Sequence, residues 1–364
     1  MDAEVPTVAV EPFGTTPAGA GIDLCTLTSG AGLTLQVITY GATVQRLLVP
    51  DAAGNLADVV LGYATLEEYV SGNPAYFGST IGRYANRIAH GRFELGGVAY
   101  EVSPNEGDKA LHGGAVGFDQ RVWKLERAGV EQGRAVLVLS YTSPDGEMGF
   151  PGELTVAVTY VVSADNSVRI DYRATADRTT VVNLTNHTYW NLAGEGVGLI
   201  DDHVLLLNAS TYTPFDPDLI PTGAVEPVAG TALDFRQPAT VGAKLTVGDP
   251  QIEIGGGGFD TNYVLDPGAI GSLELAAELS EPTSGRLLEI FTTEPAIQLY
   301  VGQHLDGTGN GKTGVPHRAR SGIAFETQHY PDSVNRPQFP PTTLEPGERF
   351  SSSTLWRFSA RRSA

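Results

Sequence analysis

The segment NLTNHTYWNLAG (183–194) places His187 among side chains that can form hydrogen bonds. In a strand, successive side chains point to opposite faces, which divides this segment into a polar row and a largely apolar row. The polar row would consist of Asn183, Thr185, His187, Tyr189 and Asn191. Short polar groups beside an aromatic ring lose little entropy when they bind hydroxyls, as a sugar site requires. An edge strand with a half-buried histidine would give the same pattern, and this segment alone leaves both interpretations open.

A carboxylate occupies a similar position near the C-terminus, in the segment GIAFETQHYPD (322–332). The alternation predicts a strand in which Glu326 lies opposite Ile323 and Phe325. A carboxylate with mainly apolar neighbours must be paired, or it is kept there for proton transfer. From the sequence alone, a structural ion pair with an arginine explains Glu326 equally well.

Further polar side chains occur in segments rich in glycine or in strand-forming residues. They are Arg83, Asn86, Arg87 and His90 in GRYANRIAHGRF, His112 in LHGG, Asp260 in GFDTNYVL and Gln298 in AIQLYVG. The two glycines after His112 would let the backbone approach a ligand closely.

Each of these residues also has a purely structural interpretation. Arg83 and Arg87 could lie at a sheet edge, and Arg92 is expected on the surface. His112 could cap a turn, and Asp260 could accept hydrogen bonds from the backbone of the preceding glycine run. Each signal is therefore weak when it is taken alone.

Other kinds of chemistry find no support in the sequence. His112, His187 and Glu326 are far apart in the chain and lack the spacing of metal ligands. No glycine-rich segment joins a strand to a helix, so no nucleotide site is indicated. No G-x-S-x-G nucleophile motif is present. We expect no metal and no cofactor.

Bulk properties limit the partners and the location of the protein. The 364 residues carry a formal net charge of −19, which disfavours binding to nucleic acids and to anionic membranes. The single cysteine, Cys25, excludes an intrachain disulfide and is expected in the core. The N-terminal segment lacks the basic and apolar regions of a secretion signal, so we expect a cytoplasmic monomer or homodimer.

Short alternating runs between frequent glycines and prolines predict an all-β chain, a large antiparallel β-sandwich with very little helix. The runs 154–162 and 168–175 predict a hairpin closed at SADNS. The segment 64–72 is the best helical candidate, and Gly255–Gly258 is expected to be a loop that leads to a site. Without a linker-like change in composition, we expect a single domain over residues 1–364, with its core at about 20–360.

Six segments in order resemble the aldose 1-epimerases, also called galactose mutarotases. They are GRYANRIAHGRF, LHGG followed by GFDQRVW, NLTNHTYWNLAG, GFDTNYVL, TTEPAIQLYVG and ETQHYPDSVNRPQFPP. The resemblance extends from about residue 20 to the C-terminus. It implies the galactose mutarotase-like supersandwich fold and interconversion of the α and β anomers of free hexoses such as glucose and galactose.

The resemblance implies a role for each matching residue. His187 would be the general acid and Glu326 the general base. The substrate-binding residues would be Asn86, Arg87, His112, Asp260 and Gln298. The polar face around His187 would then look into an open sugar cleft. The chain departs from the family at Glu294, where glutamine is common, and the negative charge of Glu294 could raise the pKa of Glu326. It also departs at Trp190, where phenylalanine is common, and this second difference should matter less.

These residue types suit the reaction, because ring opening removes a proton from the C1 hydroxyl and adds one to the ring oxygen. A carboxylate with a pKa of about 4.3 and an imidazole with one of about 6.5 provide the base and the acid. Three alternatives remain: a glycosidase, which normally needs two carboxylates; a sugar-binding protein without catalysis; and a sugar-phosphate epimerase, which needs more cations at the rim.

Overall fold

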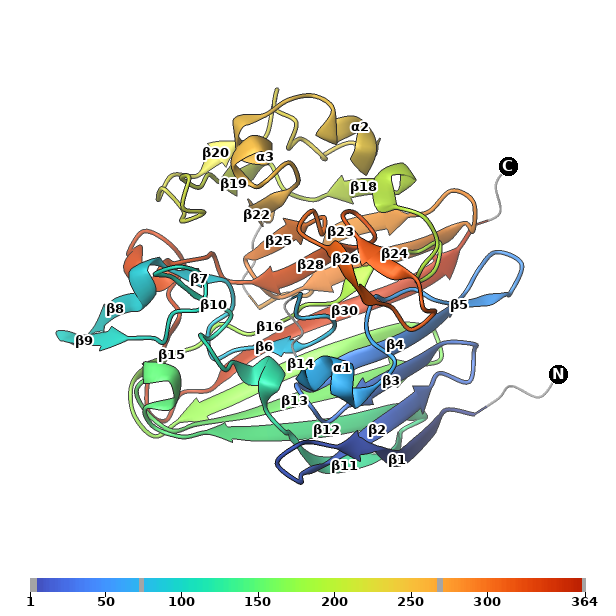
Figure 1. Ribbon diagram of the computed structural model, residues 1–364, viewed down its shortest axis with the longest axis horizontal. Coiled ribbons are helices and arrows are strands. Elements are labelled where there is room, and N and C mark those ends of the chain that lie inside the picture. Colours follow the sequence, from blue (N-terminus) through green and yellow to red (C-terminus); the bar gives the residue numbers. More distant parts are fainter. Residues whose placement is uncertain (1–4, 72–74, 267–270, 362–364) are drawn as a thin grey trace.

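The structure is a computed structural model that describes residues 5–71, 75–266 and 271–361. Within these residues the strands form three large antiparallel sheets, of nine, six and five strands, and several two-stranded ribbons (Figure 1). The prediction of an all-β antiparallel sandwich is confirmed. The helices of these residues are short, and α1 (Leu66–Val70) lies where the sequence predicts a helix.

Two of the large sheets place strands that are distant in the sequence side by side. In spatial order, the nine-stranded sheet contains β11 (Lys124–Glu131), β12 (Arg134–Ser143), β13 (Leu154–Ser163), β14 (Ser167–Ala176), β30 (Phe350–Ala360), β24 (Arg286–Thr292), β23 (Glu274–Ser280), β18 (Val204–Leu207) and β21 (Ala239–Thr240). The six-stranded sheet contains β17 (Tyr189–Trp190), β28 (Ile323–Gln328), β25 (Ala296–Tyr300), β22 (Asp260–Val264), β19 (Thr211–Thr213) and β20 (Glu226–Pro227). The five-stranded sheet contains β1 (Thr7–Thr15), β2 (Gly21–Thr28), β3 (Thr34–Ile38), β4 (Thr43–Pro50) and β5 (Leu56–Asp58), which follow one another in the chain.

Short ribbons and helices connect the large sheets. The ribbons pair β6 (Thr80–Ile81) with β16 (Thr185–Asn186), β7 (Arg87–Ile88) with β10 (Ala110–Leu111), β8 (Arg92–Leu95) with β9 (Val98–Glu101), β15 (Thr180–Val181) with β29 (Thr343–Leu344), and β26 (Asp306–Asn310) with β27 (Pro316–Arg318). The remaining helices are α2 (Val241–Leu245), α3 (Pro250–Ile254) and the 3₁₀ turns η1 (Ala89–Gly91), η2 (Phe118–Gln120), η3 (Glu147–Gly149), η4 (Ile200–Asp202) and η5 (Ser333–Asn335). Figure 1 shows α2 and α3 close together at the end of the molecule where β18, β19 and β20 lie.

The predicted hairpin of residues 154–175 shows how the alternating pattern builds the nine-stranded sheet. Strands β13 and β14 pair from Leu154 opposite Ala176 to Ser163 opposite Ser167. In β13 every second side chain, from Leu154 to Val162, is fully buried, because the period of two places all of them on the inner face. Each fully buried Val or Leu contributes roughly 1.5–3 kcal/mol relative to an exposed one.

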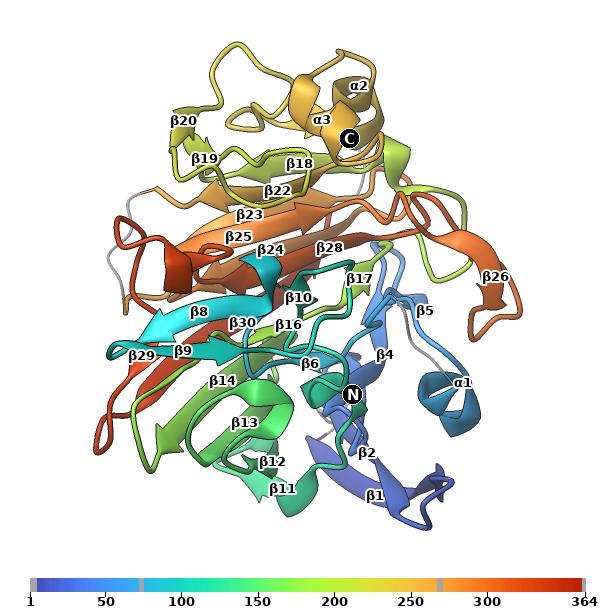
Figure 2. The same ribbon diagram turned by 60° about the vertical axis from the view of Figure 1, so that its left-hand side comes forward.

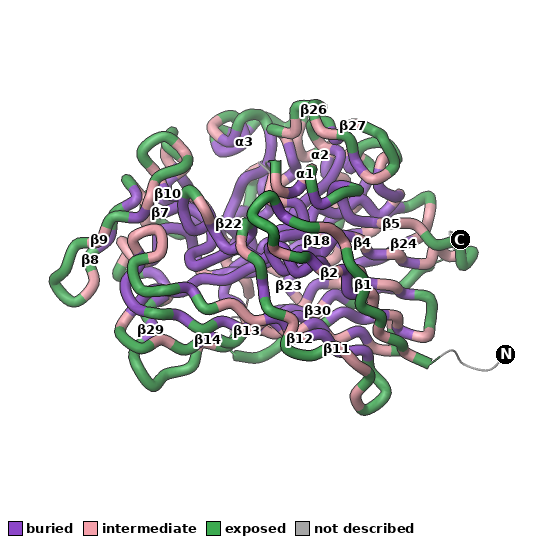
Figure 3. The backbone as a smooth tube through the Cα atoms, turned by 60° about the horizontal axis from the view of Figure 1, so that its bottom comes forward, coloured by how far each residue is buried: buried purple, intermediate pink, exposed green. Residues whose placement is uncertain are grey.

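One hydrophobic cluster joins the three large sheets. The ring of Trp190 in β17 meets the ring of Trp356 in β30 edge to face, with centroids 4.7 Å apart. Cys25 of β2 belongs to the same cluster and is buried, as the sequence predicts. Figure 3 shows the buried stretches in the interior and the exposed backbone mainly in peripheral turns.

Three neighbouring inner strands of the six-stranded sheet, β22, β25 and β28, have one apolar and one polar face. Tyr263, Ile297 and Phe325 point into the hydrophobic cluster. On the opposite face Gln298 is directly across from Glu326 on the neighbouring strand. Figure 2 shows β22, β25 and β28 side by side, with the ends of β10 and β16 nearby. This sheet therefore presents polar side chains to segments from the first half of the chain.

The short helix α1 starts with a capping box. The backbone N–H of Glu68 donates to Oγ1 of Thr65 over 3.4 Å, and the backbone N–H of Thr65 donates to Oε2 of Glu68 over 3.0 Å. None of the helices in the described part of the chain is long and apolar enough to cross a membrane.

Candidate active site

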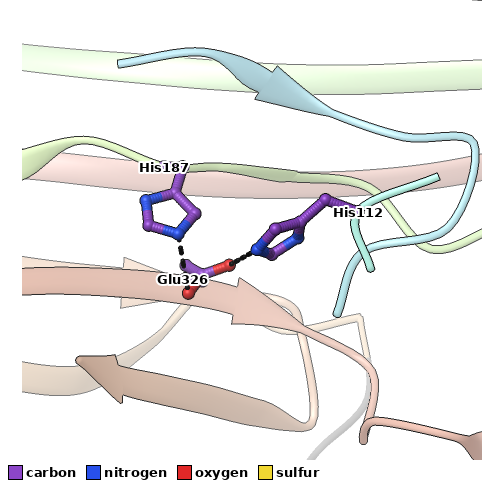
Figure 4. Close-up of side chains that lie close together, drawn as sticks. All are labelled: His112, His187 and Glu326. Atoms are coloured by element: carbon purple, nitrogen blue, oxygen red, sulfur yellow. Dashed lines mark ion pairs between the residues drawn. The ribbon is translucent and has the colours of Figure 1, made fainter. Parts of the chain in front are cut away.

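His187, Glu326 and His112 come together from three distant parts of the chain (Figure 4). Nε2 of His187 lies 3.4 Å from Oε1 of Glu326, and Nε2 of His112 lies 4.0 Å from Oε2 of the same carboxylate. Glu326 projects from β28, His187 lies between β16 and β17, and His112 directly follows β10. All three side chains are at most 5 % exposed.

The three side chains line a cavity of about 330 Å³, a volume typical of small-molecule sites. Its lining also includes Asn86, Arg87 and Asp260, three of the other residues that the sequence proposes. Further lining residues that sequence reasoning missed are Tyr63, Tyr76, Phe77, Glu106, Tyr300, His304, Asp306 and His317. The cavity thus combines aromatic rings with convergent polar groups.

The segment around His187 differs from the single strand that the sequence predicts. Residues 180–190 form three short strands, β15 just before the segment and β16 and β17 within it, and these pair with three different partners. His187 and Tyr189 line the cavity as predicted. The prediction that the whole polar row faces a cleft is wrong, because Asn183 and Asn191 donate to backbone carbonyls instead. These two asparagines hold the strand in place.

Backbone hydrogen bonds fix the position of His187. Its N–H donates to the carbonyl of Ser79 over 2.9 Å, and its carbonyl accepts from the N–H of Gly78 over 3.0 Å. The side chain of Asn186 donates to the carbonyl of Gly78 and accepts from the N–H of Thr188. The imidazole therefore leaves a rigid backbone, as a catalytic group requires.

Burial shifts the proton affinities of the pair in opposite directions. It lowers the pKa of His187 to about 4, although the hydrogen bond to its own backbone opposes this. It raises the pKa of Glu326 well above its usual value; the charge of Asp260 adds to this, and Arg87 opposes it. Both groups are driven toward their neutral forms, because charge is costly away from water. When both groups are neutral, the pair holds one proton, and this proton is on Glu326.

The hydrogen bond of His112 decides which of its nitrogens carries the proton. Nδ1 of His112 accepts from the backbone N–H of Asn86 over 3.2 Å. Burial lowers the pKa of His112 well below its usual value, with His187 and Arg87 adding to this, so the ring is neutral. A neutral ring that accepts at Nδ1 has its hydrogen on Nε2. His112 therefore offers a hydrogen-bond donor beside Glu326.

This tautomer also bears on metal binding. Potential ligand atoms of His112, His187 and Glu326 lie within 4.8 Å of one another, which is close enough to surround an ion. A metal needs the lone pair of the imidazole nitrogen, and on Nε2 of His112 a hydrogen occupies that position. The three residues therefore suit hydrogen bonding and proton transfer better than metal coordination.

A cluster of charges forms another wall of the cavity. Nε and Nη2 of Arg87 donate to the two oxygens of Glu106 over 2.7 and 2.9 Å, and Nη1 donates to Oδ2 of Asp260 over 3.4 Å. The other oxygen of Asp260 accepts from Nε2 of Gln298 over 2.6 Å. Gln298 is 2 % exposed and lies behind Asp260 rather than among the lining residues.

Two further arginines from the same sequence segment lie in opposite surroundings. Arg83 is buried, contrary to the surface or edge position considered for it, and its guanidinium donates to the carbonyls of Pro151 and Gly152. Arg92 is exposed and pairs with Glu101, as expected for a surface arginine.

Glu294, the residue that departs from the family pattern, is bound away from the cavity. Oε2 of Glu294 lies 2.7 Å from Nδ1 of His329. The causes that shift the pKa of Glu326 are its burial, Asp260 and Arg87. The pairing with His329 accounts for the charge of Glu294, so it does not act on Glu326 in the way that the sequence suggests.

The family model for aldose 1-epimerase matches residues 23–357 of this chain. The chain belongs to the aldose 1-epimerase family. As a member of this family it is an isomerase that interconverts the anomers of an aldose. The six segments that suggested this epimerase all lie within or at the edges of the matched region.

Individual relatives of this epimerase agree with the match. A galactose mutarotase of Mus musculus is 45% identical over 350 residues, covering 95% of this chain and 97% of the relative. An aldose 1-epimerase of Escherichia coli (strain K12) is 36% identical, covering 94% of this chain and 97% of its own. The crystal structure of galactose 1-epimerase from Lactobacillus acidophilus NCFM superposes with a TM-score of 0.85 at 30% identity, covering 98% of this chain and 99% of that one. Both fold and family are therefore shared along nearly the whole chain.

Proposed function

We propose that this aldose 1-epimerase acts on free aldohexoses such as galactose and glucose, with His187 and Glu326 as its acid and base. The observation that carries the proposal is the distance of 3.4 Å between Nε2 of His187 and Oε1 of Glu326 at the wall of the cavity. The ring oxygen and the anomeric hydroxyl of a pyranose are bonded to the same carbon. Two groups this close can therefore each reach one of these oxygens at hydrogen-bond distance.

In ring opening, Glu326 removes the proton of the C1 hydroxyl while His187 gives a proton to the ring oxygen. The open aldehyde rotates about its C1–C2 bond and recloses with the opposite configuration. On reclosure His187 takes its proton back and Glu326 returns the other. The pair holds one proton before and after each turnover, so no external acid or base is consumed. Fixed positions make the two transfers intramolecular.

The resting proton on Glu326 must move to His187 before this reaction can start. Burial favours the neutral pair, whereas catalysis uses the imidazolium and the carboxylate. A bound sugar supplies hydroxyl dipoles to both groups, and hydrogen bonds to a charged form stabilise it. The burial also keeps the aldehyde away from water while the ring is open.

The other polar lining residues suit hydroxyl binding. The N–H of His112 that points toward Glu326 can donate to the anomeric oxygen, and the side chains of Asn86, Arg87 and Asp260 can bind the remaining hydroxyls. We propose that Gln298 acts through Asp260, since its amide donates to that carboxylate over 2.6 Å.

The alternative functions fit these contacts less well. A glycosidase normally uses a second carboxylate beside the first, whereas the group 3.4 Å from Glu326 is the imidazole of His187. A sugar-binding protein without catalysis would not require a buried acid and base in contact. A glycosidase would release reducing sugar from an oligosaccharide, which we do not expect of this chain.

The experiment dissolves crystalline α-galactose in a dilute, weakly catalytic buffer and follows optical rotation with and without the enzyme. The wild type should speed the approach to equilibrium. Glu326→Gln and His187→Asn should each lower kcat/KM by roughly 10²–10⁴-fold, because each removes one proton-transfer group. Both variants should remain folded by circular dichroism.

Glu294→Gln is a matched control, because it is the same substitution at another buried glutamate that pairs with a histidine. It should keep activity within a few-fold of the wild type. If Glu326→Gln were as active as Glu294→Gln, the assignment of Glu326 as the base would be wrong.

A further inference from the structure

Glu106 occupies the part of Arg87 that would otherwise bind an anion. Its two carboxylate oxygens accept from Nε and Nη2 of Arg87 over 2.7 and 2.9 Å, the bidentate geometry in which arginine binds carboxylates and phosphates. The third nitrogen, Nη1, faces Asp260 over 3.4 Å. Every nitrogen of the guanidinium thus already faces a carboxylate of the chain. No pair of unoccupied N–H donors remains to bind a charged ligand in bidentate geometry.

The charges around Arg87 are balanced. Nζ of Lys109 lies 3.6 Å from Oε2 of Glu106, and it also donates to the carbonyl of Asp218 over 2.7 Å. Arg87, Lys109, Glu106 and Asp260 therefore form a group of two cations and two carboxylates. Among the lining residues that the structure describes, Arg87 is the one arginine or lysine. An anionic ligand would meet no uncompensated cation here.

Glu106 also faces the ligand space itself. Its side chain is 31% exposed, whereas that of Arg87 is 9% exposed, and both residues line the cavity. Partial burial alone would raise the pKa of Glu106, but pairing with Arg87 outweighs it and lowers this pKa, so the carboxylate is charged at neutral pH. A negative group on a sugar would therefore approach a fixed carboxylate rather than an available guanidinium.

We propose that Glu106 is a specificity-determining residue that restricts the cavity to uncharged aldoses and excludes sugars with a carboxylate or a phosphate. The guanidinium of Arg87, held by two carboxylates, donates to hydroxyls and does not act as an anion clamp. Replacing Glu106 by glutamine leaves the group around Arg87 with one excess positive charge, and it leaves one nitrogen on that edge of the guanidinium without an acceptor, because the amide has a single oxygen. The inference rests on the proposed action on free aldohexoses.

Galactose and galacturonate provide the test, because they share the same ring and differ only in a hydroxymethyl group against a carboxylate at C6. Polarimetry measures kcat/KM for both at low ionic strength, where charge effects are strongest. The wild type should favour galactose by at least tenfold. In Glu106→Gln the ratio of galacturonate to galactose kcat/KM should rise at least tenfold, and 0.5 M salt should reduce this gain.

Asp108→Asn is the matched control, since it removes a charge from an exposed carboxylate that pairs with His90 outside the cavity. Its substrate ratio should equal that of the wild type. An unchanged ratio in Glu106→Gln, or an equal rise in Asp108→Asn, would overturn the inference. So would equal turnover of the two sugars by the wild type, a measurement that needs no variant. Failure of the wild type to turn over galactose would instead refute the proposed substrate class.

Discussion

Lys312 connects one wall of the cavity to the rest of the protein through buried polar contacts. Its replacement by methionine should therefore lower the stability of the protein and weaken substrate binding. Its side chain is 2 % exposed, and its Nζ lies 2.8 Å from Oδ2 of Asp58. The same ammonium donates to the carbonyl of Gln45 over 2.7 Å and to that of Val60 over 2.8 Å. Lys312 follows β26, whose Asp306, Thr308 and Gly309 line the cavity. The contact therefore fixes the hairpin that forms this wall.

The loss of folding free energy in Lys312→Met depends on how well the remaining carboxylate of Asp58 is still hydrogen-bonded. Removing one partner of a buried ion pair costs about 3–5 kcal/mol. Asp58 is 13% exposed and still accepts from the N–H groups of Leu47 and Val60, so we expect the lower end, about 3 kcal/mol. With an unfolding entropy of about 2.1 cal/mol/K per residue, a chain of 364 residues loses about 1.3 °C of Tm per kcal/mol, which gives a decrease of about 4 °C.

Thermal unfolding and steady-state polarimetry measure the two consequences of Lys312→Met. Tm should fall as calculated, and KM for galactose should rise with little change in kcat, because the wall binds substrate without transferring protons. Lys124→Met is the matched control; Lys124 pairs with Glu126 and is 74% exposed, so its Tm should change little. An equal Tm for both variants, or an unchanged KM in Lys312→Met, would refute the reasoning.

Two further predictions concern pH. Because His187 and Glu326 must hold one proton together, the pH profile of kcat/KM should be bell-shaped. Its acid limb should lie near pH 4, the lowered pKa of His187, and its alkaline limb should lie well above the usual pKa of a glutamate. A flat profile between pH 3 and 10 would count against the pair. His203 is buried, accepts from the N–H of Leu192 over 2.9 Å, and has a pKa that burial lowers to about 4. Between pH 6.5 and 4 the unfolded chain binds more protons at this residue, so acidification should remove about 3 kcal/mol of stability. His203→Gln should flatten this part of the urea-unfolding profile, and an identical slope in both proteins would contradict the assignment.

Local alternation and motif order in the sequence were sufficient to predict the fold class and the main catalytic candidates. The hairpin of β13 and β14 was predictable because its apolar residues recur with the period of a strand that has one buried face. His187 and Glu326 were recognisable because polar groups on otherwise apolar strands need a reason to be there.

Long-range contacts could not be predicted in this way. The chain around His187 forms three short strands, and beside them Asn183 and Asn191 bind carbonyls of Ala85, His329 and Ser321 from distant parts of the chain. No local pattern distinguishes such an asparagine from one that binds a ligand. Glu106 was missed for a related reason: it lies six residues before His112 in an ordinary polar turn, and only the fold brings it to Arg87.

The order of the proton affinities is the part of the site that depends most on three-dimensional structure. Reference values place the proton on the imidazole and the charge on the carboxylate. Burial by strands distant in sequence reverses this order, because it lowers the pKa of His187 to about 4 and raises that of Glu326 well above its usual value. A neutral pair costs the folded protein less than a buried ion pair without a complete set of hydrogen bonds. In the proposed mechanism, the charged pair forms when sugar hydroxyls bind to both groups. In that mechanism, burial therefore couples the proton transfer of these two residues to the presence of substrate.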